Sequence, residues 1–138
     1  MNHYTYEEIQ VGQEISFSAA ITEERMRSFR EISGDENPLH RDATYAREKG
    51  YADSVCYGML TASFLSKVAG VYLPGERSLI HRVETDFVQP VLLGDTLTIT
   101  AKVQKKMDSF RAIVLQVSMT NQNGAQVCRA KMRVGVLA

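Results

Sequence analysis

Residues 58–72 read Gly58-Met-Leu-Thr-Ala-Ser-Phe-Leu-Ser-Lys-Val-Ala-Gly-Val-Tyr72. Apolar residues fall on nearly every side of a helix built from this stretch, so we predict a helix that lies inside the protein. Pro74-Gly75 directly after it is typical of a helix end. The stretch contains Lys67 and is shorter than the roughly 20 residues that a bilayer crossing needs. We therefore expect a soluble protein with a buried central helix.

Four segments that follow this helix alternate between apolar and polar residues, which predicts half-buried strands. The Asn123-Gly124 dipeptide before the last of them suits a tight hairpin turn. The alternating positions that define the four strands, apolar apart from His81, are Leu79, His81, Val83 and Phe87; Leu97, Ile99, Ala101 and Val103; Ile113, Leu115, Val117 and Met119; and Cys128, Ala130, Met132, Val134 and Val136.

A strand and two short helices are predicted before residue 58. Residues 14–21 alternate in the same way. Thr22 then stands where a helix N-cap would, and Met26, Phe29 and Ile32 at three-residue spacing predict an amphipathic helix that ends at Gly34. Asp42 is placed to cap a second helix ending at Gly50. One curved antiparallel sheet wrapped around the long helix, an α+β fold in a single domain over residues 1–138, accounts for this order.

Composition excludes several classes of partner. The chain has 138 residues, 44% of them hydrophobic, with 16 Lys+Arg against 16 Asp+Glu. A balanced charge gives no long-range attraction to nucleic acid or anionic membranes. Cys56 and Cys128 form no CxxC pair and no metal-binding spacing, so we expect two buried thiols, no bound metal and a reducing, cytoplasmic location. The N-terminus lacks the basic and apolar regions of a signal peptide.

The most informative segment is Phe29-Arg-Glu-Ile-Ser-Gly-Asp-Glu-Asn-Pro-Leu-His40, followed by Ala46. It resembles the signature of the (R)-specific enoyl-CoA hydratases, or hydratase 2, within the MaoC-like family of hot-dog-fold proteins. The resemblance continues through residues 58–63 and reappears at 90–97, in family order. It implies a hot-dog fold and reversible hydration of trans-2-enoyl-CoA to (R)-3-hydroxyacyl-CoA. It also implies a homodimer and no cofactor, since coenzyme A or pantetheine arrives as part of the thioester substrate.

The same resemblance assigns roles that the chemistry supports. A carboxylate and an imidazole five residues apart on a proline-stiffened loop can hold one water molecule. Asp35 is then the base that takes the water proton, and His40 holds the water and supplies or relays a proton to carbon. The backbone N–H of Gly58 is expected to bind the thioester oxygen at a helix N-terminus.

Three further residues complete the predicted oxyanion and substrate-binding set: Ser63, Asn37 and Tyr57. Ser63 matches the family serine near the thioester and would add a supporting hydrogen bond. Tyr57 is a departure, because the family usually has histidine before the oxyanion glycine. The change bears on the shape of the substrate pocket and on how the glycine loop is braced.

Simpler structural roles exist for the same residues. Asp35 could cap backbone N–H groups of its loop, with His40 satisfied by a carbonyl. Ser63 could bond to the preceding helical turn, and Gly58 could be a turn glycine. His81 on its strand is expected to be structural.

Three other functions remain open. One is a dehydratase that acts on 3-hydroxyacyl groups bound to acyl carrier protein, in lipid or polyketide synthesis. Another is a thioesterase, which is disfavoured because no carboxylate occurs between Gly58 and Tyr72. The last is a non-catalytic acyl-CoA-binding subunit, which would bind ligand without turnover.

Overall fold

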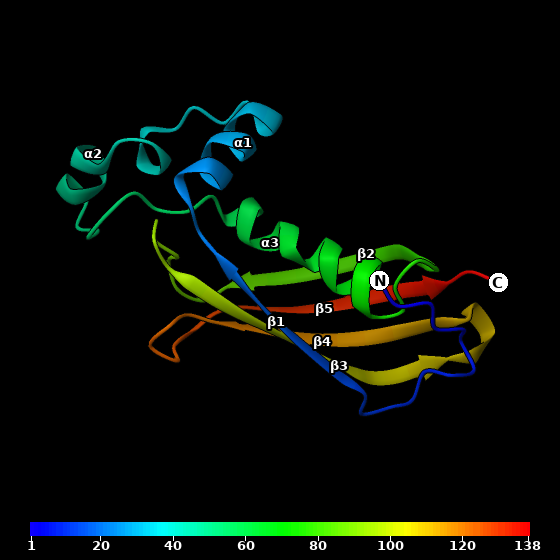
Figure 1. The fold of residues 1–138 in the computed structure, drawn as a ribbon. Helices are drawn as coiled ribbons and strands as arrows, with labels where there is room; N and C mark the ends of the chain where they lie inside the picture. Colours follow the sequence, from blue (N-terminus) through cyan, green and yellow to red (C-terminus); the bar gives the residue numbers. More distant parts are fainter.

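A five-stranded antiparallel sheet with one helix lying against it forms the body of the protein (Figure 1). The computed structural model describes all residues 1–138. The strands are β1 Glu14–Ala20, β2 Ser78–Phe87, β3 Thr96–Met107, β4 Ala112–Thr120 and β5 Gln126–Val136, in the spatial order β1-β3-β4-β5-β2. The helices are α1 Glu23–Ser33, α2 Ala43–Glu48 and α3 Gly58–Lys67, which a π-helical segment, Val68–Tyr72, extends. The predicted α+β arrangement is confirmed.

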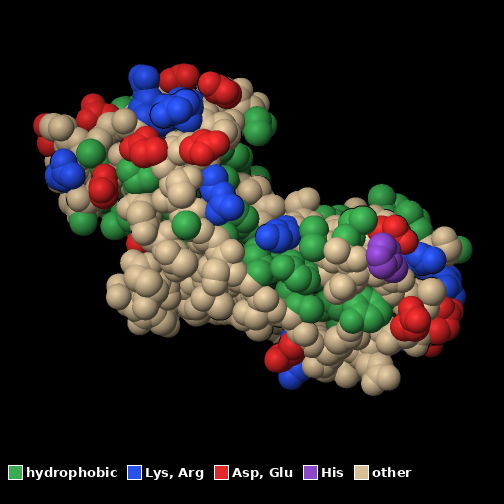
Figure 2. Space-filling view, in the orientation of Figure 1, with side chains coloured by type: hydrophobic (Ala, Val, Ile, Leu, Met, Phe, Trp, Pro, Cys, Tyr) green, Lys and Arg blue, Asp and Glu red, His purple; other side chains and the backbone are tan.

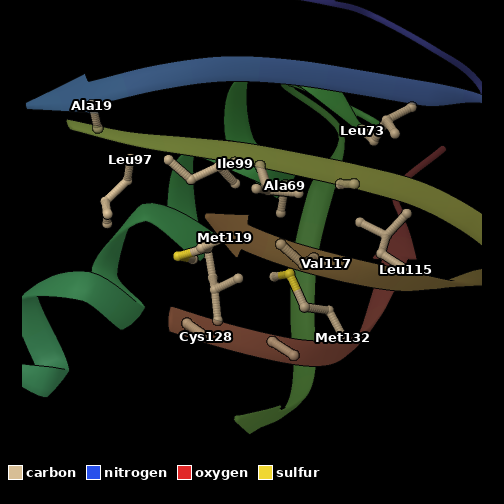
Figure 3. Close-up of a cluster of buried hydrophobic side chains, with 14 of the residues drawn as sticks. Ala19, Ala69, Leu73, Leu97, Ile99, Leu115, Val117, Met119, Cys128 and Met132 are labelled. Atoms are coloured by element: carbon tan, nitrogen blue, oxygen red, sulfur yellow. The ribbon is translucent and has the colours of Figure 1, made fainter. Parts of the chain in front are cut away.

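The core lies between the sheet and α3. On β3, Leu97, Ile99, Ala101 and Val103 are all 0% exposed, as their alternation predicts. Figure 3 shows side chains of neighbouring strands gathered beside Ala69 and Leu73 of the helical segment. The alternating apolar positions of β4 and β5 are buried in the same cluster, so three of the four predicted strands have the predicted inner face.

Helix α3 is buried on one side only in the single chain. Leu60, Leu65 and Val68 face the core, whereas Met59 is 65% exposed. The prediction of a helix enclosed on all sides is therefore wrong for the isolated chain. The reason is geometric: one sheet of five strands covers one face of a helix and leaves the opposite face open. No helix is long and apolar enough to span a bilayer.

Strand β2 departs from its predicted alternation. The β2–β5 register shifts between Ile80 and Arg82, which makes His81 an extra residue in the strand. A β-bulge of this kind reverses which face the later side chains occupy. Ile80 and Val83 consequently line the same groove. Val83 and Phe87 pair with Met132 and Cys128 of the buried face of β5 and so keep the predicted inner face, whereas Leu79 and His81 do not. His81 is exposed and packs over Gly135, where an added Cβ would come within 2.6 Å of its Nε2.

Helices α1 and α2 lie together beyond one end of the sheet (Figure 1). Both begin as predicted: the Thr22 side chain accepts a hydrogen bond from the Arg25 N–H, and the Asp42 side chain accepts one from the Tyr45 N–H. The apolar face of α1 is only partly used, because Met26 is buried but Ile32 is 82% exposed. In Figure 2, charged side chains gather on this end and on the opposite end of the molecule, with hydrophobic side chains between them.

Candidate active site

The loop after α1 holds Asp35 in a fixed turn. Gly34 has the left-handed φ of 73° that closes the helix. The Asp35 Oδ1 atom accepts a hydrogen bond from the Asn37 N–H at 3.0 Å, and Asn37 Oδ1 accepts one from the Leu39 N–H at 3.0 Å. Successive side-chain turns of this kind define the loop without regular structure. Pro38–His40 forms a short 3₁₀ turn at the end of this loop.

His40 is oriented by a backbone carbonyl. Its Nδ1 lies 2.7 Å from the carbonyl oxygen of Val55. A carbonyl only accepts hydrogen bonds, so Nδ1 carries the proton of the neutral ring and Nε2 carries the lone pair. This tautomer is assigned from the hydrogen-bond network. Nε2 is therefore the nitrogen free for chemistry.

Asp35 and His40 face one another across a short gap. The His40 Nε2 and Asp35 Oδ2 atoms are 3.8 Å apart, with side chains 14% and 44% exposed respectively. That distance is too long for a direct hydrogen bond. One water molecule can contact both atoms from beside the gap, which is the geometry that shared activation of water requires.

Gly58 brings a helix N-terminus to the same place. It begins α3, and its backbone N–H donates to no other main-chain group, whereas the N–H groups of Leu60 and Thr61 both donate to the Tyr57 carbonyl. Free N–H groups of a first helical turn, together with the helix dipole, favour a partly negative oxygen. Gly58 and His40 line one cavity of about 290 Å³.

The rest of this cavity is mostly apolar and contains no carboxylate. The Phe87 ring closes it above Gly58, 3.4 Å from where a Cβ on that residue would be. The other lining residues are Val55, Cys56, Thr61, Val88, Gln89, Pro90, Val91 and Val127. A cavity of this kind accepts an apolar chain next to a few polar groups.

The remaining predicted site residues lie outside the cavity lining. Asn37 uses its side chain to shape the loop. Tyr57 is 1% exposed and packs behind His40, with the two ring centroids 4.2 Å apart. The Ser63 hydroxyl donates to the Leu60 carbonyl at 2.6 Å and faces a separate apolar groove. In the single chain, therefore, Asp35 lies beside His40, and His40 lines one cavity with Gly58, whereas Asp35 itself is outside that lining and Ser63 faces a separate groove.

Cys56 is in the cavity wall but is not an activated thiol. Burial raises its pKa to about 11. A thiol with a raised pKa stays protonated and unreactive at neutral pH. Cys128 is also buried, and its pKa is likewise raised by burial to about 11. The prediction of two buried thiols is confirmed. No group of three or more His, Cys, Asp or Glu side chains is close enough to hold a metal ion.

Sequence patterns missed three contributors to the site. The Val55 carbonyl that orients His40 is a main-chain group. Every residue type has such a carbonyl, so the sequence does not indicate its role. Phe87 was predicted only as an inward strand position. Arg30, which donates to the Tyr57 hydroxyl at 2.8 Å, is one of three arginines in α1, and nothing in the sequence distinguishes it from the other two.

This fold and this site place the chain among hot-dog proteins with a carboxylate–imidazole dyad beside a helix N-terminus. The sequence model described as "MaoC like domain" matches residues 7–125. The (R)-specific enoyl-CoA hydratase of Rhodospirillum rubrum is 36% identical over 79% of this chain and 78% of its own length. The (R)-specific enoyl-CoA hydratase of Aeromonas caviae is 30% identical over 85% and 87%.

A solved structure supports the same family assignment. The R-hydratase from Pseudomonas aeruginosa in its unliganded form superimposes with a TM-score of 0.91, covering 96% of this chain and 85% of that one at 29% identity. The chain belongs to the MaoC-like family, and the hot-dog fold that its sequence implied is confirmed.

Proposed function

We propose that this protein hydrates trans-2-enoyl-CoA reversibly to (R)-3-hydroxyacyl-CoA, with Asp35 and His40 as catalytic residues. The observation that carries the proposal is that the Asp35 carboxylate is 3.8 Å from His40 Nε2 and that His40 lines one cavity with Gly58, whose N–H is free. Hydration of a conjugated thioester needs a base for water, a proton for the α-carbon and a donor for the thioester oxygen. The Asp35 carboxylate is the base, the His40 Nε2 lone pair accepts a hydrogen bond from the same water molecule, and the Gly58 N–H is the donor for the thioester oxygen. The proton for the α-carbon is the one that the dyad has taken from water.

The proton balance of the reaction closes within the dyad. Asp35 and His40 hold one water molecule, and one of its protons passes to the Asp35 carboxylate as the oxygen bonds to the β-carbon. The C=C electron pair moves toward the thioester carbonyl, giving an enolate-like oxygen. The dyad then returns one proton to the α-carbon, so it ends the turnover as it began. The reaction is redox-neutral, and this scheme requires no cofactor beyond the thioester carrier itself.

Gly58 stabilises the negative charge that develops on the thioester oxygen. Its free N–H is at the positive end of α3, and the missing side chain leaves the backbone open to the cavity. Donors fixed in this way contribute strongly because they need no reorganisation during the reaction. Asn37 then acts by shaping the loop. Direct contact of Ser63 with substrate finds no support in its position.

A homodimer is the second part of the proposal. β2 is at the edge of the sheet, with Leu79, Ile80 and Val83 each 40–53% exposed. A long apolar edge strand has unpaired backbone N–H and C=O groups, which favour pairing with another strand. A second copy can pair its own β2 antiparallel to the first, which gives a closed two-fold interface.

The same interface would shield the dyad. A mostly apolar groove of about 560 Å³ runs from β2 across the open face of α3 to Phe29 and Ser33 at the end of α1. Ser33 is two residues before Asp35, so a partner seated in this groove would lie beside the half-exposed carboxylate. Excluding bulk water there strengthens the electrostatic effects of the site.

Two further expectations stay predictions: that residues 1–138 form one domain and that the protein is cytoplasmic.

The test is direct. Crotonyl-CoA is mixed with the protein, and loss of the conjugated enoyl-thioester absorbance is followed, with chiral analysis of the product. We expect turnover and the (R) product. If short, medium and branched enoyl-CoAs are all inert, the same acyl groups are offered on an acyl carrier protein. Turnover there alone would replace coenzyme A by the carrier protein. Binding without turnover on either carrier would refute the hydratase proposal in favour of an acyl-binding subunit.

Gly58→Ala should lower activity while preserving the fold. The new Cβ would be 3.4 Å from Phe87, an ordinary contact, but it would stand at the cavity wall beside the donor N–H. We expect kcat/KM for crotonyl-CoA to fall about tenfold or more, toward the loss seen when an oxyanion donor is removed. Gly70→Ala is the control, because its Cβ would meet only the Ser78 Oγ, at 3.9 Å, and Gly70 does not line the cavity. Equal kcat/KM in the Gly58 variant and the wild type would remove Gly58 from the proposed site.

A further inference from the structure

Tyr57 is a buried tyrosine that connects three parts of the site without lining its cavity. It directly precedes Gly58 and is 1% exposed. The cavity wall contains His40 and Gly58 but not Tyr57. Its contacts are therefore with the protein, not with a ligand in that cavity.

The Tyr57 hydroxyl bridges α1 and the Asp35 loop. It accepts a hydrogen bond from Arg30 Nε at 2.8 Å and donates one to the backbone carbonyl of Asp35 at 3.2 Å. A hydroxyl that accepts from a guanidinium is polarised, which strengthens the bond it donates in turn. Arg30 thus acts on the main chain of Asp35 through Tyr57.

The Tyr57 ring fixes the plane of the His40 imidazole. The two rings are stacked at 28° with centroids 4.2 Å apart, and Phe29 packs on the tyrosine with centroids 5.0 Å apart. The Val55 carbonyl holds His40 at Nδ1. One contact sets the ring plane and the other sets its rotation, so together they direct Nε2 toward Asp35.

We propose that Tyr57 and Arg30 are a positioning pair that holds the Asp35 carboxylate and the His40 ring in register with the Gly58 N–H. This rests on the hydratase function proposed above. Tyr57 is not the proton donor in this arrangement, because its single hydroxyl hydrogen is used by the Asp35 carbonyl. The earlier expectation that Tyr57 binds substrate gives way to a role exerted through its neighbours.

Tyr57→Phe isolates the hydroxyl, because it keeps the ring on His40 and removes both hydrogen bonds. Since misplacing catalytic groups by about 1 Å can cost about 100-fold, we expect kcat for crotonyl-CoA to fall about tenfold with KM nearly unchanged. Arg30→Ala should give a similar loss, and Arg30→Lys should recover part of it. The double variant Arg30→Ala/Tyr57→Phe should be no worse than Tyr57→Phe alone, because both changes break one chain of hydrogen bonds.

Matched controls separate positioning from general destabilisation. Arg27 is exposed on the same helix, and Tyr51 is a partly exposed tyrosine that does not line the cavity. Arg27→Ala and Tyr51→Phe should leave kcat unchanged. An unchanged kcat in Tyr57→Phe would overturn the proposal. So would a raised KM at constant kcat, which would mean that Tyr57 contacts substrate after all.

A second measurement does not depend on activity. Nitrogen NMR of the His40 ring reports which nitrogen carries the proton. We expect only the Nδ1–H form in the wild type and in Tyr57→Phe, and a mixture of tautomers in Tyr57→Leu, which removes the stacked ring. An unchanged His40 spectrum in folded Tyr57→Leu would refute the ring's part in positioning. If the wild type fails to hydrate any enoyl thioester while these spectra behave as expected, the hydratase proposal fails and the positioning geometry stands.

Discussion

Asp35→Asn is expected to lower kcat for crotonyl-CoA hydration by at least ~100-fold without changing the fold. An amide cannot take a proton from water, whereas its oxygen can still accept the hydrogen bond from the Asn37 N–H that shapes the loop. The change therefore removes the base and keeps the turn. The measurement is the loss of enoyl-thioester absorbance, with thermal unfolding to show that the variant is folded.

The neighbouring carboxylate provides a matched control. Glu36 is exposed and pairs with Arg41 at 3.3 Å, on the same loop but outside the dyad. Glu36→Gln should stay within about twofold of the wild type, as expected for a surface ion pair. His40→Ala should fall as far as Asp35→Asn, and the double variant little further, because residues that act as a unit are not additive. Substantial activity in Asp35→Asn would exclude Asp35 as the base.

Val83→Glu is expected to dissociate the proposed dimer and to remove most of the activity with it. Val83 is 43% exposed on the edge strand and lines the apolar groove beside Ile80 and Met59. In a two-fold interface one substitution buries two unpaired carboxylates, each costing several kcal/mol, so the dissociation constant should rise by roughly 1,000-fold or more. Light scattering after gel filtration measures the mass, and the crotonyl-CoA assay measures the consequence.

Val11 provides the control for this second change. It is 63% exposed and apolar, but it lies just before β1, at the opposite edge of the sheet. Val11→Glu should keep the wild-type mass and activity. A Val83→Glu protein with the mass of the wild type would mean that β2 and the open face of α3 are not the interface.

Local patterns predicted the elements well because their causes are local. Thr22 and Asp42 cap their helices through side chains that reach only three residues along the chain. The alternation of β3 and β4 predicted their buried faces because successive side chains of a strand point to opposite sides. The loop from Gly34 to His40 was predicted as the site for a related reason: its turns are made by its own side chains.

The errors arise where a residue's surroundings come from elsewhere in the chain. The bulge at His81 depends on how β2 pairs with β5, some 50 residues later, and it puts Leu79 and His81 off the inner face on which Val83 and Phe87 lie. The exposed side of α3 depends on how many strands cover it. Ile32 matches the apolar spacing of α1, yet no element packs against it. In each case the amino acid has the expected character and the fold does not supply the expected neighbour.

The sequence by itself determined the two catalytic candidates, the glycine that opens α3 and the apolar strands that bury its inner face. A short loop and a period-two pattern carry that information within a few residues. Only the tertiary structure decided that the Val55 carbonyl sets the His40 tautomer and that Tyr57 joins Arg30 to Asp35. Contacts between residues 15 to 27 positions apart form only when separate segments pack together, so their geometry comes from the fold and not from residue type.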